Sequence, residues 1–300
     1  MSRARRLSRV AALQMTSLRS DIAARARTLL RDGYELHLAS NRDVISRLDM
    51  EPLGIRVSPW DFLAPAAGAW SVADLMRIYA VLNAAAFDAK GIPIPTWVMI
   101  DLGLLPSAFM LVTLPRGHAA QVADEARTAG DAAGARTAQI LDAVLAEADR
   151  LGHAGPIPLA GYCAAPTPDP SAWVGWSLCS AVPGLGTVAK GLALAAYRAR
   201  TLTGVAQFSD HGLRVHRKFG RMEILRAVLD LHPVTHTLVY RTSVFDDGDE
   251  AEGGEPSFWL DIRDLEAQRA IQGRLDSGAS RFFILSPGLV DDRVPILERH

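Results

Sequence analysis

The hydrophobic and polar positions of the chain follow two different periods, and together they predict a mixture of helices and strands. Apolar residues that recur every three or four positions predict helices. They do so over 8–32, 71–87, 118–151 and 187–200. Shorter apolar runs, bounded by glycine, proline or polar residues, predict strands. These runs are 33–40, 53–62, 96–102, 107–114, 159–165, 172–180, 203–208, 235–244 and 281–286.

Capping and breaking residues sharpen two of the helices and divide the chain. Ser71 opens the 71–87 helix and Asp74 follows three positions later, which is a helix-capping pattern. Gly130 and Gly134 interrupt the 118–151 segment, so it is expected to form one long helix or two shorter ones. The proline-, alanine- and glycine-rich stretch before Trp70 marks a loose boundary near residue 66.

The alternation of helices and strands, with adjacent strand pairs among them, predicts an α+β protein with a mixed α/β sheet. Three regions are expected along the chain. They are an N-terminal helical and extended region over 1–66, a main domain over 67–245 with a helical insertion at 117–152, and an acidic loop with a C-terminal extension over 246–300.

Composition narrows the class of protein. The chain has 300 residues, 49% of them hydrophobic and 22% charged, which is a globular composition. The net charge of −1 argues against a dedicated nucleic-acid-binding protein. Cys163 and Cys179 form no CxxC pair, so we expect no zinc framework or disulfide scaffold, and we infer a reducing cytoplasm. No apolar run approaches the roughly 20 residues of a membrane-spanning helix.

Two further features bear on origin and metals. Lysine occurs only at positions 90, 190 and 218, whereas arginine and alanine are abundant, which indicates a GC-rich bacterial genome. His232 and His236 have Pro233 between them, and the acidic run 246–255 lacks the ligand order of an EF-hand. We therefore expect no metal site.

The stretch "VPGLGTVAKGLALAAYR", residues 182–198, is the strongest candidate for chemistry. A strand, a glycine turn and the N-terminus of a helix together present unpaired N–H groups and a positive dipole end, which suit a phosphate group. The alternative is a tight strand-to-helix connection without a ligand. A P-loop is excluded because Gly191 is followed by Leu192. A dinucleotide site stays open, since Gly184-x-Gly186-x-x-Ala189 fits GxGxx[GA] and Asp210 follows the next strand.

Residues 173–224 resemble the heart of the GCN5-related N-acetyltransferase (GNAT) superfamily. That family has a strand, a pyrophosphate loop of the form [QR]-x-x-G-x-[GA], a helix, a strand and a short helix that ends in K-x-G-F. Here residues 181–186 correspond to the loop and residues 218–220 to K-x-G. Ala181 stands at the position of the Gln or Arg, Pro183 removes one N–H donor, and Arg221 replaces the closing Phe.

The resemblance implies a GNAT-like acyl-CoA N-acyltransferase fold with N-terminal, helical-insertion and C-terminal additions. It implies acyl-CoA as co-substrate, acetyl-CoA or longer, with the pantetheine arm along the edge of strand 173–180. The implied cofactor-binding residues are Leu178, Gly184, Leu185, Gly186, Thr187, Val188 and Lys190. His216 occupies the position of the Tyr that protonates the leaving thiolate, so it is the implied catalytic acid.

The implied activity is transfer of an acyl group from a thioester to a small-molecule amine. Asp101 and Tyr162 are candidates for a general base, and a carrier-protein thioester or an aminoacyl-tRNA is an alternative donor. Two other classes stay open. One is an NAD(P)-binding oxidoreductase. The other is a non-catalytic or regulatory protein that keeps the cradle without the chemistry, which Ala181 and Pro183 leave open.

Overall fold

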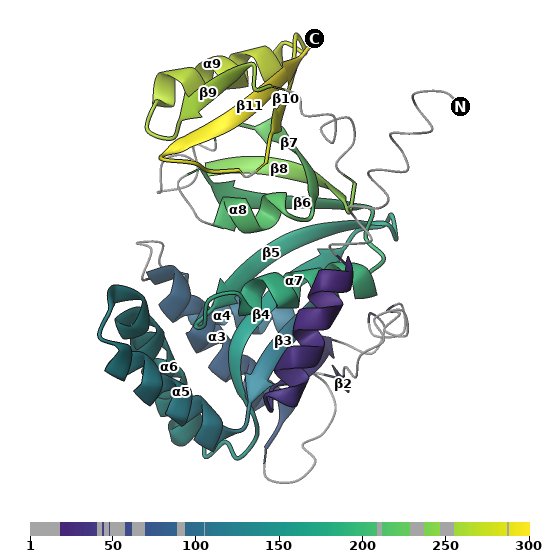
Figure 1. Ribbon diagram of the computed structural model, residues 1–300. Coiled ribbons are helices and arrows are strands. Elements are labelled where there is room, and N and C mark those ends of the chain that lie inside the picture. Colours follow the sequence, from purple (N-terminus) through teal and green to yellow (C-terminus); the bar gives the residue numbers. More distant parts are fainter. Residues whose placement is uncertain are drawn as a thin grey trace. The chain divides into compact units, whose positions relative to one another are not determined.

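The computed structural model (Figure 1) describes most of the chain. The described residues are 19–40, 44, 48, 58–61, 70–88, 94–104, 106–208, 212–228, 237–246, 255–286 and 288–300. Contacts divide the chain into two compact units. The larger unit comprises residues 21–166 and 176–198, and the smaller unit comprises residues 1–20, 167–175 and 199–300.

The larger unit is built on buried strands. β1 (Glu35–Ser40) pairs in parallel with β2 (Ser58–Asp61) on one side and antiparallel with β3 (Ala108–Leu114) on the other. β3 pairs antiparallel with β4 (Ile157–Pro166), and β5 (Ala172–Ser180) is next in the sheet order. All seven residues of β3 are buried, which is expected for a strand with helices on both of its faces.

Helices cover the two faces of these strands. On one face, the ring of Tyr79 from α3 (Val72–Asp88) lies over Gly161 of β4, where a Cβ atom would come within 2.3 Å of it. The next residue, Tyr162, faces Lys190 of α7 (Leu185–Ala196). Successive side chains of a strand point to opposite faces, so α3 and α7 cover opposite faces. Helical residues 19–31 accompany α7 (Figure 1).

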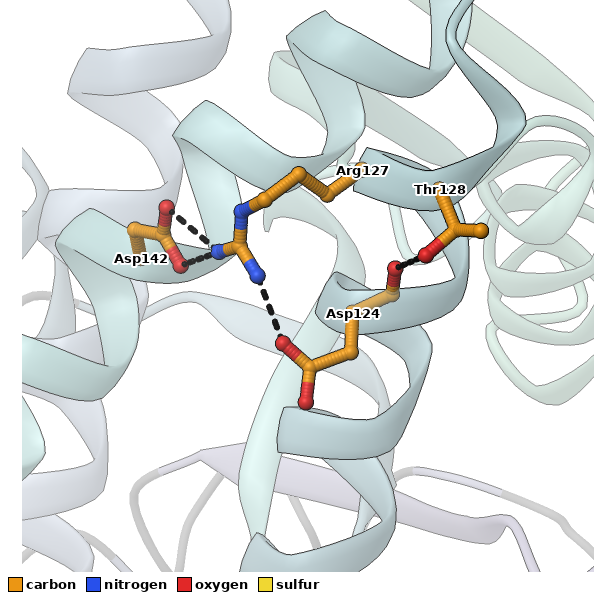
Figure 2. A network of polar contacts seen from close by, with 4 residues as sticks. All are labelled: Asp124, Arg127, Thr128 and Asp142. Atoms are coloured by element: carbon orange, nitrogen blue, oxygen red, sulfur yellow. Dashed lines mark hydrogen bonds and ion pairs between the residues drawn. The ribbon is translucent and has the colours of Figure 1, made fainter.

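The segment predicted as a helical insertion at 117–152 forms a helical hairpin. α5 (Arg116–Ala129) ends at Gly130, whose φ of 71° is left-handed, and α6 (Ala132–Arg150) starts after Asp131. The Asp131 carboxylate accepts a hydrogen bond from the Gly134 N–H at 2.6 Å, which caps α6. The prediction of a break at one of these glycines is confirmed. Figure 2 shows how Arg127 of α5 links the hairpin, because its guanidinium contacts Asp142 of α6 at 2.9 Å.

The smaller unit is an antiparallel sheet with helices on one face. Its sheet order after β5 is β6 (Thr201–Gln207), β8 (Thr237–Val244), β7 (Gly220–Arg226), β10 (Arg281–Ile284), β11 (Arg293–Arg299) and β9 (Phe258–Asp261). Its helices are α8 (Gly212–Arg217) and α9 (Leu265–Asp276). Residues of both strands and helices, from Ala206 to Ile296, share one buried core.

The predicted α+β class is confirmed, but the predicted GNAT-like acyltransferase fold with terminal additions is wrong. The described strands form one 11-stranded mixed sheet in the order β2-β1-β3-β4-β5-β6-β8-β7-β10-β11-β9. Strands expected in the N-terminal and C-terminal additions are members of that sheet. β1, for example, pairs with β3 over all six of its residues. Strands with unpaired edges recruit neighbouring segments, which explains why the terminal segments are part of the sheet.

One predicted strand is a helix. Residues 96–102 lie in α4 (Thr96–Leu104), where the Val98 N–H donates to the Pro95 carbonyl in the first turn. A short apolar run fits a buried strand and a buried helix equally well by period, and here contact with α3 favours the helix. This also corrects the environment predicted for Asp101, which lies exposed on a helix and not at the end of a strand.

Candidate functional site

The candidate site is the glycine turn between β5 and α7 in the larger unit. Three hydrogen bonds fix the turn to its surroundings. The Ala181 N–H donates to the Leu159 carbonyl of β4 at 2.8 Å, and the Thr137 hydroxyl of α6 donates to the Ala181 carbonyl at 2.8 Å. The Ser180 hydroxyl donates to the Val182 carbonyl at 2.5 Å. The backbone that enters α7 is therefore held in place before any ligand arrives.

The two glycines of the turn serve different purposes. Gly184 is the N-cap of α7 with φ 88° and ψ −24°, a left-handed conformation that favours glycine. It is exposed, and a Cβ atom there would meet nothing within 4 Å. Gly186 is closely surrounded instead, because a Cβ atom there would lie 3.3 Å from Leu178 Cδ1, which is closer than an ordinary van der Waals contact. Gly186 therefore lets α7 lie close to β5.

Two backbone donors in the first turn of α7 have no acceptor in the part of the chain that the structure describes. The Leu185 N–H donates to the Val182 carbonyl and the Val188 N–H to the Gly184 carbonyl, both at 3.4 Å. Among the described residues, the N–H groups of Gly186 and Thr187 have no hydrogen-bond acceptor. They lie at the positive end of the helix dipole, so this turn offers a place for an anion.

The predicted cofactor-binding residues fall into this turn, but mostly with buried side chains. Leu185, Gly186, Thr187, Val188 and Lys190 are buried, Leu178 is half-buried, and Gly184 is exposed. The turn therefore presents backbone groups to a ligand, with little contribution from side chains. Leu178 was predicted because the pantetheine arm was expected along the edge of strand 173–180. In the structure, the side chain of Leu178 lies directly against Gly186.

Lys190 does not lie at the surface of the turn. Its side chain is fully buried, and Nζ lies 5.6 Å from the ring centroid of Tyr162, which is also buried. Burial lowers the pKa of Lys190 to about 7, because an ammonium loses its hydration in the interior. This placement gives no support to Lys190 as a phosphate ligand, and it makes the amine a titratable group of the core.

The edge of β5 next to the turn is open among the described strands. β5 pairs in parallel with β6 only from Ala172 to Val174, although β5 continues to Ser180. Beyond Val174, no described strand pairs with β5 on that edge. On this stretch of β5, the side chain of Trp176 is 53% exposed. An extended ligand with amide groups could pair with this edge and end at the glycine turn.

The predicted catalytic residue lies in the smaller unit. His216 is on α8, and its Nδ1 shares a hydrogen bond of 2.9 Å with the Tyr240 hydroxyl. Burial raises the pKa of Tyr240, so its hydroxyl stays protonated and can orient the imidazole. Tyr240 in turn lies over Gly204 of β6, where a Cβ atom would come within 2.6 Å of the hydroxyl. Asp210, the acid of the dinucleotide alternative, lies outside the described residues.

Sequence reasoning missed a pocket of about 330 Å³ in the larger unit. Its lining comes from segments far apart in the chain, namely Glu35, Trp60, Trp70, Pro115, Arg116, Ala154, Gly155 and Pro156. Aromatic residues flank the proline- and alanine-rich stretch before α3, and this was the only signal of the pocket in the sequence.

Two searches of the described residues were negative. They contain no helix that is both long and apolar enough to cross a bilayer. They also contain no group of three or more His, Cys, Asp or Glu side chains arranged to hold a metal ion. In comparisons with known proteins, no family model and no curated protein matches the chain.

Proposed function

We propose that the chain transfers an acyl group from a thioester, in the simplest case acyl-CoA, to a small-molecule amine. One observation carries the proposal: the two acceptor-free N–H groups of Gly186 and Thr187 lie where the open edge of β5 ends. Coenzyme A combines a diphosphate with an extended arm that contains two amides. The local resemblance of residues 173–224 to GNAT proteins supports the same ligand.

In this proposal the diphosphate binds at the glycine turn, and the pantetheine arm lies along residues 176–180. The diphosphate accepts hydrogen bonds from Gly186 and Thr187, and the dipole of α7 favours its charge. The backbone amides of β5 pair with those of the arm. This accounts for a cradle that offers backbone donors while its side chains are buried.

The chemistry needs one carbonyl carbon, one nucleophile and one acid. The amine nitrogen attacks the thioester carbonyl, the C–S bond breaks, and the thiolate takes a proton. We assign that proton to His216 on the family resemblance alone, and within the smaller unit Tyr240 orients the ring through the 2.9 Å hydrogen bond. The amine loses its own proton to water on forming the amide, and His216 regains a proton from water, so the net products are an N-acyl amine and a free thiol.

The proposal extends to location and donor. A cytoplasmic location suits it, because acyl-CoA is a cytoplasmic metabolite and the buried Cys163 and Cys179 form no disulfide bond. A carrier-protein thioester or an aminoacyl-tRNA is the alternative donor. An NAD(P)-binding oxidoreductase is less well supported, because β6 pairs antiparallel with β8, whereas the strands of a dinucleotide-binding sheet are mostly parallel.

The experiment is ligand binding by a matched pair of variants. Gly184 can be replaced by Asp or by Asn, which have the same shape and tolerate a left-handed φ, and a Cβ atom there meets nothing within 4 Å. Asp places a carboxylate where the diphosphate would bind, and Asn does not. Binding of acetyl-CoA, a long-chain acyl-CoA, free coenzyme A, NADH and NADPH is measured by calorimetry and thermal shift.

We expect the coenzyme A compounds to bind and the nicotinamide cofactors not to bind. Gly184→Asp should weaken coenzyme A binding at least ten-fold relative to Gly184→Asn, while both variants keep similar melting temperatures. Equal binding by the two variants would contradict the assignment of the turn. Binding of NADH or NADPH alone would favour the oxidoreductase, and binding of coenzyme A without acyl transfer to any amine would favour a regulatory protein.

A further inference from the structure

The unpredicted pocket of the larger unit lies at one end of β1, β3 and β4. Glu35 opens β1, Pro115 and Arg116 follow β3, and residues 154–156 precede β4. Its volume is about 330 Å³, which is at the lower end of the range for small-molecule sites. None of its lining residues belongs to the glycine turn, so the pocket is a second candidate site that does not depend on the proposed function.

Aromatic rings make up much of the wall, and each is held by a neighbour. Trp60 stacks on His37 with ring centroids 3.5 Å apart and planes at 16°. Trp70 meets Trp60 edge to face at 5.1 Å and 67°, and it meets His153 at 5.5 Å and 69°. Two indoles at a steep angle form a corner whose negative faces attract a cation.

Gly155 fixes the position of Trp70. A Cβ atom at residue 155 would lie 2.5 Å from Trp70 Cδ2, so only glycine lets the backbone lie against this ring. The His153 ring nitrogen Nε2, which shares a hydrogen bond of 3.1 Å with the Pro156 carbonyl, ties the same loop together. The indole corner is therefore a defined feature of the wall, with a preset angle and little freedom to collapse.

Among the described residues of the lining and their ion-pair partners, the charges leave an excess of one negative charge. Glu35 shares a hydrogen bond of 3.1 Å with His37 Nε2. Burial lowers the pKa of His37 to about 3, so the ring is neutral near pH 7 and leaves the Glu35 charge uncompensated. Arg116 is the cation of the lining, and it forms an ion pair with Asp149. Arg116 is therefore already neutralised, and its guanidinium is not available as a site for an anion.

We propose that this pocket binds a small organic cation, namely an alkylated ammonium group, with Trp60 and Trp70 against its methyl groups and Glu35 as its counter-charge. The combination of a two-indole corner and one unneutralised carboxylate is the chemistry that recognises such ions. A bare metal cation is not favoured, because the described residues of the lining offer a single carboxylate and the others are apolar or cationic.

The test compares a cation with its neutral isostere on the full-length protein. Choline and 3,3-dimethylbutan-1-ol have the same shape, and only choline is charged. Their binding is measured by calorimetry and by tryptophan fluorescence, at low ionic strength with matched chloride concentration. We expect choline to bind at least ten-fold more tightly than the alcohol. Equal binding, or no binding of choline, would overturn the proposal.

Three variants separate the pocket from a general effect on folding. Glu35→Gln should weaken choline binding at least ten-fold and leave binding of the neutral alcohol unchanged. Trp70→Leu should abolish the fluorescence response to choline. Trp97→Leu is the control, since Trp97 is 61% exposed on α4 and outside the lining, and it should bind choline like the wild type. Unchanged choline binding in Glu35→Gln would overturn the assignment even where Trp70→Leu fails to fold.

Discussion

At the scale of single residues, Lys190 is the clearest case of a side chain whose environment changes its chemistry. The ammonium of a lysine normally stays in water, yet this one is fully buried on the face of α7 that packs on β4. A cation–π contact with Tyr162 at 5.6 Å offsets only part of the lost hydration. The lowered pKa of about 7 expresses that imbalance.

This imbalance predicts how stability depends on pH. The unfolded lysine keeps a pKa of about 10.5. Between pH 7 and 10.5 the unfolded state therefore binds more protons than the folded state, and stability rises with pH, by about 1 kcal/mol per pH unit. Replacing Lys190 by Met removes this term, so the variant should exceed the wild type in stability at pH 7, with the difference shrinking toward pH 10.

The check is urea unfolding of both proteins at several values between pH 7 and 10. Titration of other groups affects both proteins alike, so the difference between them isolates Lys190. A difference that stays constant with pH would mean that Lys190 is charged in the folded protein. The same comparison also tests the placement of this residue in the core, which sequence had put at the phosphate.

Helix geometry explains why the burial of Lys190 was not predicted from the sequence. A residue near the start of a helix can lie at the end that meets a ligand or on the face that packs in the core. The apolar period of 187–200 fits several rotations of the helix, so it does not decide between these two positions. The conformation of Gly184 was easier to predict, because a glycine directly before a helix indicates a backbone conformation that other residues rarely adopt. The pocket could not be predicted, since Glu35, Trp60 and Trp70 meet only through tertiary packing.

At the scale of elements, prediction succeeded where caps and periods agreed. Ser71 accepts a hydrogen bond from the Asp74 N–H at 3.0 Å, as the capping pattern indicated for α3. The prediction failed at residues 96–102, where neither a capping residue nor the apolar period distinguished a strand from a helix. β7, β9 and β11 were not predicted, because the formation of strands of four to seven residues depends on their partners in the sheet.

The cap of α6 gives a prediction at this scale. Asp131→Ala removes the acceptor of the Gly134 N–H bond and should lower the free energy of unfolding by about 1 kcal/mol. Asp131→Asn keeps a side-chain oxygen and should stay close to the wild type. Chemical denaturation measures both. Equal losses in the two variants would show that the charge of Asp131, and not its capping bond, matters for the hairpin.

At the scale of the whole molecule, the described strands form one sheet while the contacts form two units. Residues 1–66 and 246–300 were predicted to be additions because they lie outside the region that the resemblance to the GNAT family covers. Every residue other than proline has a backbone N–H and C=O group that can pair with another strand, whatever its side chain. Short runs from both regions therefore form strands of the sheet. The α+β class could be predicted from the sequence, because it depends on the local period of apolar residues. Which strands pair in one sheet could not be predicted, because pairing joins segments that are far apart in the chain.

The smaller unit nevertheless has a core of its own, and this predicts independent folding. Every member of its buried cluster, from Ala206 to Ile296, lies within residues 199–300. A fragment of these residues retains β6, β8, β7, β10, β11 and β9 in their paired order. It should therefore unfold cooperatively on heating and give dispersed amide NMR signals.

The matched control, residues 209–300, lacks β6, so the cluster residues Ala206 and Phe208 are missing and β8 loses one partner. We expect that fragment to melt at a lower temperature. A fragment 199–300 without a cooperative transition would mean that the core requires the remaining residues of the chain, and the division into two units would then describe contacts without describing stability.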